Sequence, residues 1–341
     1  MAIGLMGAWL GARAASAVRV LDQAAVSEAR ERTREVGREV GLVGERLERL
    51  VSAVSELAGN QLVHGRGGLV AVSPTSRGDV PGVEVIAADR GPGIADPTRA
   101  LAGAPERSSG SLGVGVSAAR RQVDELDVDV RLKEGTCFWA RKFASPVARR
   151  PEVGIFGVPC AGERVSGDDA MFTRTDAGLV LAVADGLGHG APAREASCAI
   201  IDGLRASPSA HDLVALFLRL DALARETRGA ALTVLRVDEA TREVECAAVG
   251  NVVALLADPS STHHFGGSSW TVGGKSATPK PVRPERVHGS AGAALVIFSD
   301  GCSRSAVPEP SGLREHPLAI AHAIAKRYGR SNDDVTVLVA R

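Results

Sequence analysis

A break rich in proline and arginine constrains the fold of this 341-residue chain more than any other feature. It reads ASPVARRPEVG, from Ala144 to Gly154, and its composition fits a linker. Helical and strand patterns alternate before the break, whereas strand patterns dominate after it. A single core rarely serves more than about 250–300 residues. We therefore predict two domains, 1–145 and 154–341, joined by a linker over 146–153.

The first stretch predicts an α+β sandwich with helices on one face of a mixed sheet. Asp22 can cap a first helix, and a second helix carries apolar residues at helical spacing. The turn signals TSRGD and KEG separate two pairs of strands. We expect a loose tail before a first strand near Val18. The other elements are expected at 22–41, 42–64, 68–74, 82–89, 116–126, 127–132 and 136–143.

The second stretch predicts two packed sheets flanked by helices, an α-β-β-α sandwich. Two helical patterns cover 191–204 and 211–226, and 258–290, dense in Gly, Ser and Pro, predicts loops with a short strand near Trp270. The strand patterns are expected at 170–175, 178–185, 231–238, 243–250, 252–258, 294–300 and 335–341.

Composition narrows the function classes. The 40 Lys and Arg balance the 40 Asp and Glu, which argues against a nucleic-acid binder that acts through bulk charge. The five cysteines are scattered without a Cys-x-x-Cys pair, as expected in a reducing cytoplasm. The apolar start lacks a basic region, and no apolar run approaches the ~20 residues of a membrane span. We therefore expect a cytoplasmic protein without a membrane span.

One group of polar residues and glycines points to nucleotide binding. Glu56, Asn60 and His64 are spaced four apart and so share one face of a helix, which alone could be a solvated face. A strand then ends at Asp89, and a glycine-rich loop precedes the next helix, where backbone N–H groups can cradle phosphates. The glycines of these two segments are Gly91, Gly93, Gly110, Gly113 and Gly115.

These motifs, AVSELAGN, IAADRGPGI, GSLGVGVSAARRQVDEL and GTCFWARKF, resemble the ATP-binding fold of histidine kinases, DNA gyrase and MutL. They are most similar to the RsbT-like switch kinases and anti-sigma factor kinases, over about 18–143. The resemblance implies a histidine-kinase-like ATPase α/β sandwich in which Asn60 ligates the Mg²⁺ of ATP, Glu56 is the base and Asp89 accepts from the adenine amino group. The glycines would wrap the triphosphate. His64 is expected to pack rather than catalyse, and 102–110 replaces the lid with a shorter, less aromatic version.

Aspartates stand at strand edges in four places of the second stretch. They could be ordinary strand caps, but carboxylates gathered at one sheet edge repel each other unless a cation holds them. Oxygen ligands without His or Cys favour Mg²⁺ or Mn²⁺ over zinc. The residues concerned are Asp168, Asp169, Asp185, Asp300, Asp333 and Asp334.

This set, with VADGLGHG around Asp185, resembles the PPM-type metal-dependent phosphatases, specifically the SpoIIE family and its small RsbX-like members, over about 154–341. The resemblance implies a PP2C-like fold and two Mn²⁺ or Mg²⁺ ions bridged by Asp185. Water activated by the metals would attack phosphoserine or phosphothreonine in line, without a phosphoenzyme. The implied further metal ligands are Asp168, the Gly186 carbonyl, Asp300 and Asp333, with Asp333 preferred over Asp334.

Other polar residues near these motifs receive simpler interpretations. His189 could assist as an acid, but a turn-stabilising role is favoured because no acid lies nearby in the sequence. Asn251 is interpreted as structural support, and the pair His263 and His264 as surface residues.

Two functions remain open at this point. The first is a bifunctional regulator, an ATP-dependent Ser/Thr kinase joined to a metal-dependent phosphatase, both acting on STAS-type antagonist proteins in bacterial stress and sigma-factor signalling. The alternative is a phosphatase whose N-terminal module senses ATP and binds a partner without transferring phosphate. An inert scaffold is disfavoured because both sets of acidic residues are present.

Overall fold

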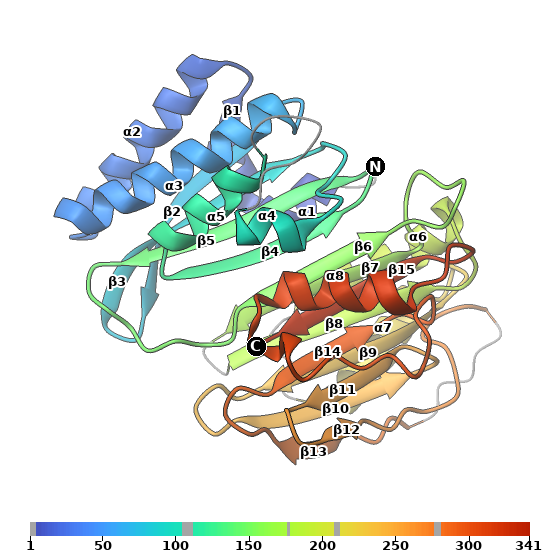
Figure 1. The fold of residues 1–341 in the computed structure, drawn as a ribbon. Coiled ribbons are helices and arrows are strands. Elements are labelled where there is room, and N and C mark those ends of the chain that lie inside the picture. Colours follow the sequence, from blue (N-terminus) through green and yellow to red (C-terminus); the bar gives the residue numbers. More distant parts are fainter. Residues whose placement is uncertain (1–4, 104–111, 176–177, 208–211, 276–280) are drawn as a thin grey trace. The chain divides into compact units, whose positions relative to one another are not determined.

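The structure, a computed structural model, divides the chain into two compact units, Met1–Glu152 and Val153–Arg341. It describes residues 5–103, 112–175, 178–207, 212–275 and 281–341, and Figure 1 shows their elements. None of the helices in these ranges is both long and apolar enough to cross a membrane.

The N-terminal unit contains a five-stranded sheet in the order β1-β2-β3-β5-β4. All four pairings are antiparallel, so the expectation of a mixed sheet was wrong. The predicted turn TSRGD is shorter than expected, because Thr75, Ser76 and Arg77 still belong to β2 and only two residues connect it to β3. The strands are β1 (Val18–Val20), β2 (Gly68–Arg77), β3 (Val80–Asp89), β4 (Glu125–Arg131) and β5 (Gly135–Phe143).

Helices α2, α3 and α5 cover one face of this sheet (Figure 1). The predicted cap of α2 is confirmed, since the Asp22 carboxylate accepts a hydrogen bond from the Ala25 N–H at 2.9 Å. The apolar spacing of the next helix is also confirmed: α3 buries Leu50 and Leu57 with their neighbours at helical intervals. The helices are α2 (Gln23–Glu39), α3 (Gly44–Val63), α4 (Pro97–Ala102) and α5 (Leu112–Gln122).

The segment before β1 is not a loose tail. It forms α1 (Leu5–Leu10) and the 3-10 helix η1 (Gly11–Ser16), and its Met6, Trp9 and Leu10 join a buried cluster with Ile86 and Ala88 of the sheet. The Trp9 indole N–H also donates to Asp129 Oδ2 at 2.9 Å. Strand side chains alternate between faces, and Asp89 faces α3, so Ile86 and Ala88 face the opposite way. Helices therefore lie on both faces of the sheet, and the expectation of helices on one face was wrong.

The C-terminal unit confirms the predicted α-β-β-α sandwich. Its sheets have the orders β7-β8-β9-β10-β13 and β6-β15-β14-β11-β12, with antiparallel pairing between the described neighbours. The strands are β6 (Val153–Val158), β7 (Asp168–Thr175), β8 (Gly178–Gly186), β9 (Ala230–Val237), β10 (Glu243–Val249), β11 (Val253–Ala257), β12 (Thr262–His264), β13 (Glu285–His288), β14 (Ala294–Phe298) and β15 (Val335–Ala340).

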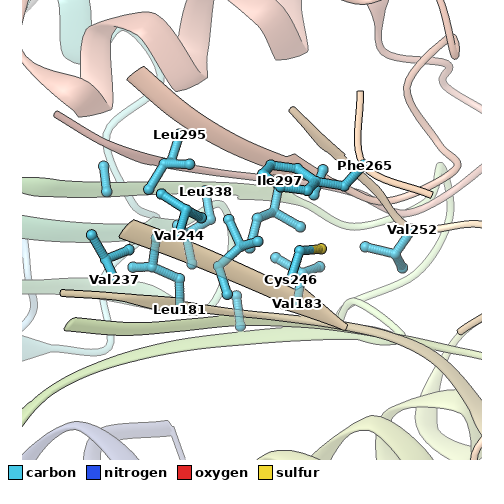
Figure 2. Close-up of a cluster of buried hydrophobic side chains, with 14 of the residues drawn as sticks. Leu181, Val183, Val237, Val244, Cys246, Val252, Phe265, Leu295, Ile297 and Leu338 are labelled. Carbon is cyan, nitrogen blue, oxygen red and sulfur yellow. The ribbon is translucent and has the colours of Figure 1, made fainter. Parts of the chain in front are cut away.

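An apolar core holds the two sheets together (Figure 2), with Leu181 and Val183 of β8 packing in the same cluster as Ile297 and Leu338. A second cluster joins β8 and β9 to α6 (Ala191–Arg205) and α7 (Leu213–Leu223). On the other sheet, α8 (Pro317–Tyr328) contacts β6 and β15. A 3-10 helix, η2, spans Gly312–Arg314.

Three elements of this unit differ from expectation. Helix α8 and strand β6 were not predicted, because α8 is buried nearly all round and has no clear apolar stripe, and β6 directly follows the proline-rich break. Among the described residues of 258–290, only isolated bridges occur near Trp270, at Ser268 and Val272, and the strands are β12 and β13.

Candidate active sites

The first candidate site lies where α3 meets α5. Glu56 and Asn60 are one turn apart on α3, and Gly115 of α5 faces both of them. A Cβ atom at Gly115 would lie 3.0 Å from Asn60 Oδ1 and 3.1 Å from Glu56 Oε2. The Asn60 Nδ2 atom is buried and has no hydrogen-bond partner among the described residues. The side-chain oxygens of Asn60 and Glu56 fit the preference of Mg²⁺ for oxygen ligands. The lack of a side chain at Gly115 leaves space for a nucleotide beside them.

Asp89 lies at the end of β3, beside the end of α3. Its Oδ1 accepts a hydrogen bond of 2.8 Å from the Gly91 N–H. Burial raises the pKa of Asp89 to about 6, and hydrogen bonds from the Gly91 and Thr136 backbones oppose that rise. Gly65, which the sequence analysis did not single out, makes this approach possible, because a Cβ atom there would lie 2.7 Å from the Asp89 Cβ. Its place directly after a predicted helix end was the available signal.

The remaining predicted nucleotide residues are distributed as follows. His64 caps α3, and its backbone N–H donates to the Asn60 carbonyl. Gly93 has a positive φ of 78° and so serves the turn after β3. Gly113 lies in the first turn of α5, whereas Gly110 and most of the predicted lid, 104–110, lie outside the described residues.

The second candidate site begins with two opposed aspartates. Asp168, the first residue of β7, is the direct cross-strand partner of Asp185 near the end of β8. Asp168 is buried, and its Oδ2 accepts no hydrogen bond from the part of the chain that the structure describes. Two carboxylates held this close with a bare buried oxygen fit a divalent cation, which prefers such hard oxygen ligands.

Asp300 and Asp333 join them from the other sheet. Asp300 follows the end of β14, and the Asn251 side-chain amide donates to its Oδ2. Asp300 and Asp333 both raise the pKa of Asp185 electrostatically, which places their charges near its carboxylate. Asn251 therefore supports an acidic residue directly, a role more specific than the general one that the sequence suggested.

Asp334 has a different task from its neighbour. Its Oδ1 accepts a hydrogen bond of 2.8 Å from the Cys160 N–H, and its Oδ2 accepts one of 2.8 Å from the Gly167 N–H. Its carboxylate is buried and engaged on both oxygens. Asp333 is partly exposed and accepts only from the Asp334 N–H among the described groups. This difference favours Asp333 as the ligand.

The aspartates of this cluster have raised pKa values. The pKa of Asp168 is raised to about 7, mainly by burial and also by the Asp334 and Asp333 charges. Burial raises the pKa of Asp185 to about 9, assisted by the Asp168 and Asp300 charges. The pKa of Asp300 is also raised, by burial and by Asp333. Within the described ranges, no three acidic, imidazole or thiol groups converge as a ready coordination shell. The site is a cluster of carboxylates that repel each other without a cation.

The glycines after Asp185 have separate roles. Gly186 is needed for close packing, since a Cβ atom there would lie 2.0 Å from the Ala193 carbonyl oxygen of α6. Gly188 and Gly190, with φ of 93° and 72°, make the turn into α6. The backbone therefore leaves the strand after Gly186 and turns at Gly188 and Gly190.

His189 has a partner that the local sequence did not offer. Its Nδ1 lies 2.9 Å from Glu163 Oε1, 26 residues away. The sequence analysis missed Glu163, which no motif marks. His263 is partly exposed and pairs with Glu285 at 2.8 Å, and His264 is exposed, as expected for surface residues.

Comparisons with known proteins agree with this division. Residues 20–142 match the histidine kinase-like ATPase domain, and residues 175–341 match the family of stage II sporulation protein E, SpoIIE. The serine/threonine-protein kinase RsbT of Bacillus subtilis is 30% identical over 128 residues, which cover 38% of this chain and 96% of RsbT. The phosphoserine phosphatase RsbX of the same organism is 27% identical over 184 residues, 53% of this chain and 89% of RsbX.

A solved structure from work on the bacterial stressosome aligns with a TM-score of 0.53 and 29% identity, covering 57% of this chain and 100% of the other. The matched ranges contain both candidate sites, apart from Asp168, which precedes the SpoIIE match. The chain therefore belongs to the RsbT-like histidine kinase-like ATPases through its N-terminal domain, and it carries a SpoIIE/PP2C domain at its C-terminal end.

Proposed function

We propose that the chain is a bifunctional regulator of partner switching. Its N-terminal domain would phosphorylate a Ser or Thr of a STAS-type antagonist protein with ATP, and its C-terminal domain would remove that phosphate. The relatives support the two chemistries, since RsbT is named as a serine/threonine-protein kinase and RsbX as a phosphoserine phosphatase. The opposed pair Asp168 and Asp185 is the single observation that carries the phosphatase half.

In the phosphatase site, Asp168, Asp185, Asp300 and Asp333 would hold two Mg²⁺ or Mn²⁺ ions together with the Gly186 carbonyl. When bound, such ions polarise phosphoryl oxygens and lower the pKa of water, which is the chemistry of phosphate-ester hydrolysis. Asn251 would keep the Asp300 carboxylate oriented through its amide hydrogen bond. Asp334 would hold the backbone at Cys160 and Gly167, and so keep Asp168 in place at the start of β7.

In the kinase site, Glu56 would accept the proton of the attacking hydroxyl, and Asn60 would hold the Mg²⁺ of ATP. Asp89 would accept a hydrogen bond from the adenine amino group, and Gly91, Gly93, Gly110, Gly113 and Gly115 would leave room for the triphosphate. Phosphoryl transfer depends mainly on positioning and charge neutralisation. The approach of Gly115 to Glu56 and Asn60 supports this arrangement.

The test follows phosphate onto and off a STAS-domain partner from the same genome, with labelled ATP and Mg²⁺ or Mn²⁺. Wild type, Asp185→Asn and Glu56→Ala would be compared at equal concentration. Label that accumulates with Asp185→Asn and disappears when Glu56→Ala is added to that variant, while Glu56→Ala still binds nucleotide, supports both activities. If wild type removes label from a phosphorylated partner but no variant ever adds it, the N-terminal domain is an ATP sensor and the kinase half fails.

A further inference from the structure

Arg330 is built into the backbone that carries the carboxylate cluster of the C-terminal domain. It lies in the turn between α8 and β15, two residues after Tyr328 and three before Asp333. Its Nη2 donates to the backbone carbonyl of Asp300, and its own N–H donates to the Gly301 carbonyl at 2.9 Å. The side chain is therefore fixed at the point where two acid-bearing segments meet.

Neighbouring backbone contacts fix the whole turn. The Ser303 N–H donates to the Tyr328 carbonyl at 3.0 Å, and Cys302 forms an isolated bridge with Gly329. On the other side, the Ala161 N–H donates to the Ser331 carbonyl at 3.0 Å, next to Cys160, which binds Asp334. The position of Arg330 thus depends on the same segments that carry the carboxylates.

The guanidinium is exposed and keeps donors available. No ion pair joins Arg330 to a carboxylate in the described ranges, unlike Arg327, which pairs with Glu309. Arg194 also donates to a ligand-bearing backbone, the Asp168 carbonyl at 2.9 Å, but it is only partly exposed. One N–H of Arg330 binds Asp300, and a guanidinium has five.

We propose that Arg330 binds the phosphoryl group of the substrate beside the metal-binding carboxylates. This inference rests on the proposed phosphatase function and assigns its phosphate-recognition residue. Four carboxylates would offset the whole charge of two divalent cations, so a dianionic phosphate monoester needs a further positive charge. An anchored guanidinium suits this role, because its planar fork matches two phosphoryl oxygens.

The experiment uses the full chain loaded with Mn²⁺ and inorganic phosphate as the probe. Phosphate binding is measured by the shift of thermal unfolding with phosphate concentration, and by inhibition of hydrolysis of a phosphoserine peptide. Arg330→Gln should weaken phosphate binding and raise the KM of the peptide, each roughly tenfold to a hundredfold, as expected for a lost hydrogen bond to a charged group. Arg330→Lys should restore part of the loss. The matched control Arg327→Gln removes an equal charge three residues away and should change neither value.

Two outcomes would overturn the inference. Unchanged phosphate affinity in Arg330→Gln would rule out phosphate binding by Arg330, whatever happens to the rate of peptide hydrolysis. If Arg330→Gln instead weakened the affinity for Mn²⁺ and left phosphate affinity unchanged, the role of Arg330 would be to position Asp300. Failure of the proposed function looks different, because wild type would then bind phosphate but not hydrolyse the peptide. The thermal readout tests Arg330 in that case too.

Discussion

Asp168 and Asp185 stand directly opposite each other on the antiparallel strands β7 and β8, and the first carboxylate is buried. Without a cation, burial and mutual repulsion raise the pKa of both groups, so each keeps its proton to a higher pH than in the unfolded chain. The negative charge of the two carboxylates therefore destabilises the metal-free fold and favours the binding of a metal ion.

Asp185→Asn should abolish phosphatase activity and stabilise the metal-free C-terminal domain at neutral pH. The folded pKa of Asp185, about 9, lies above its ordinary value of 3.8, so stability is lost as pH rises through that range. The amide has no such loss. Urea unfolding in EDTA at pH 4 and pH 7.5 checks this, with a stability gain only at the higher pH. Equal stabilities at pH 7.5 would contradict it.

Replacing the two neighbouring acids should separate activity from stability. Asp333→Asn should lose activity and keep the fold, since its amide oxygen can still accept from the Asp334 N–H. Asp334→Ala should lower the free energy of unfolding by about 2–5 kcal/mol, because two buried backbone N–H groups lose their acceptor. Unfolding curves and peptide hydrolysis measure the two effects. Similar stabilities for both variants would argue against the division of roles.

Nucleotide binding should weaken as pH falls through about 6, where Asp89 gains a proton and becomes a weaker acceptor for the hydrogen bond from an amino group. In the nucleotide-free chain the raised pKa has the opposite effect on stability, which is full below pH 3.8 and falls as pH rises through about 6. Asp89→Asn should recover up to about 3 kcal/mol of this lost stability at pH 7.5, and it should also lower the affinity for ATP. Calorimetric titration with ATP from pH 5 to 8 provides the measurement. A flat profile in wild type would remove Asp89 from the site.

A methyl group at Gly115 should impair the kinase site. Gly115→Ala places a Cβ atom 3.0–3.1 Å from the Asn60 and Glu56 side chains, and displacing such groups by about 1 Å can cost on the order of a hundredfold in rate. Gly59→Ala is the matched control, because a Cβ atom there on α3 meets nothing within 4 Å. ATP affinity and label transfer are measured for both. Equal losses in the two variants would point to a general effect on the helices.

The first helix should contribute to stability through its indole. Trp9→Phe removes the hydrogen bond to buried Asp129 and should cost about 1–3 kcal/mol of unfolding free energy. Arg13→Gln breaks an ion pair with Glu84 whose arginine is half exposed, and should cost less than about 1 kcal/mol. Urea unfolding of the two variants compares them. A larger loss for Arg13→Gln would reverse the ranking.

Much of the fold follows from local patterns. The apolar runs that became β8, β9, β14 and β15 were predicted because strands buried on both faces are continuously apolar. Helix α8 was not predicted for a related reason, since a helix that is buried nearly all round shows no apolar stripe at helical spacing. Helix α1 was not predicted because a run of six apolar residues shows no helical periodicity.

The candidate sites show the same limit. Acids at strand ends can be found by position, so Asp185 and Asp300 were predicted. Glu163 beside His189 and Gly65 beside Asp89 depend on contacts between segments 24 or more residues apart, which no spacing reveals. The choice of Asp333 over Asp334 stays a prediction, now with a physical reason in the two backbone bonds of Asp334.

Helix α1 bears on where a domain of this kind should be cut. The match to the ATPase family begins at residue 20, yet Met6, Trp9 and Leu10 belong to the same buried cluster as Ile86 of the sheet. A domain boundary placed at residue 20 would thus cut through this core. It would expose the apolar face of the sheet around Ile86 to water. An excised domain that begins at residue 20 would lack the part of the core that α1 supplies, so it would aggregate for reasons unrelated to its chemistry.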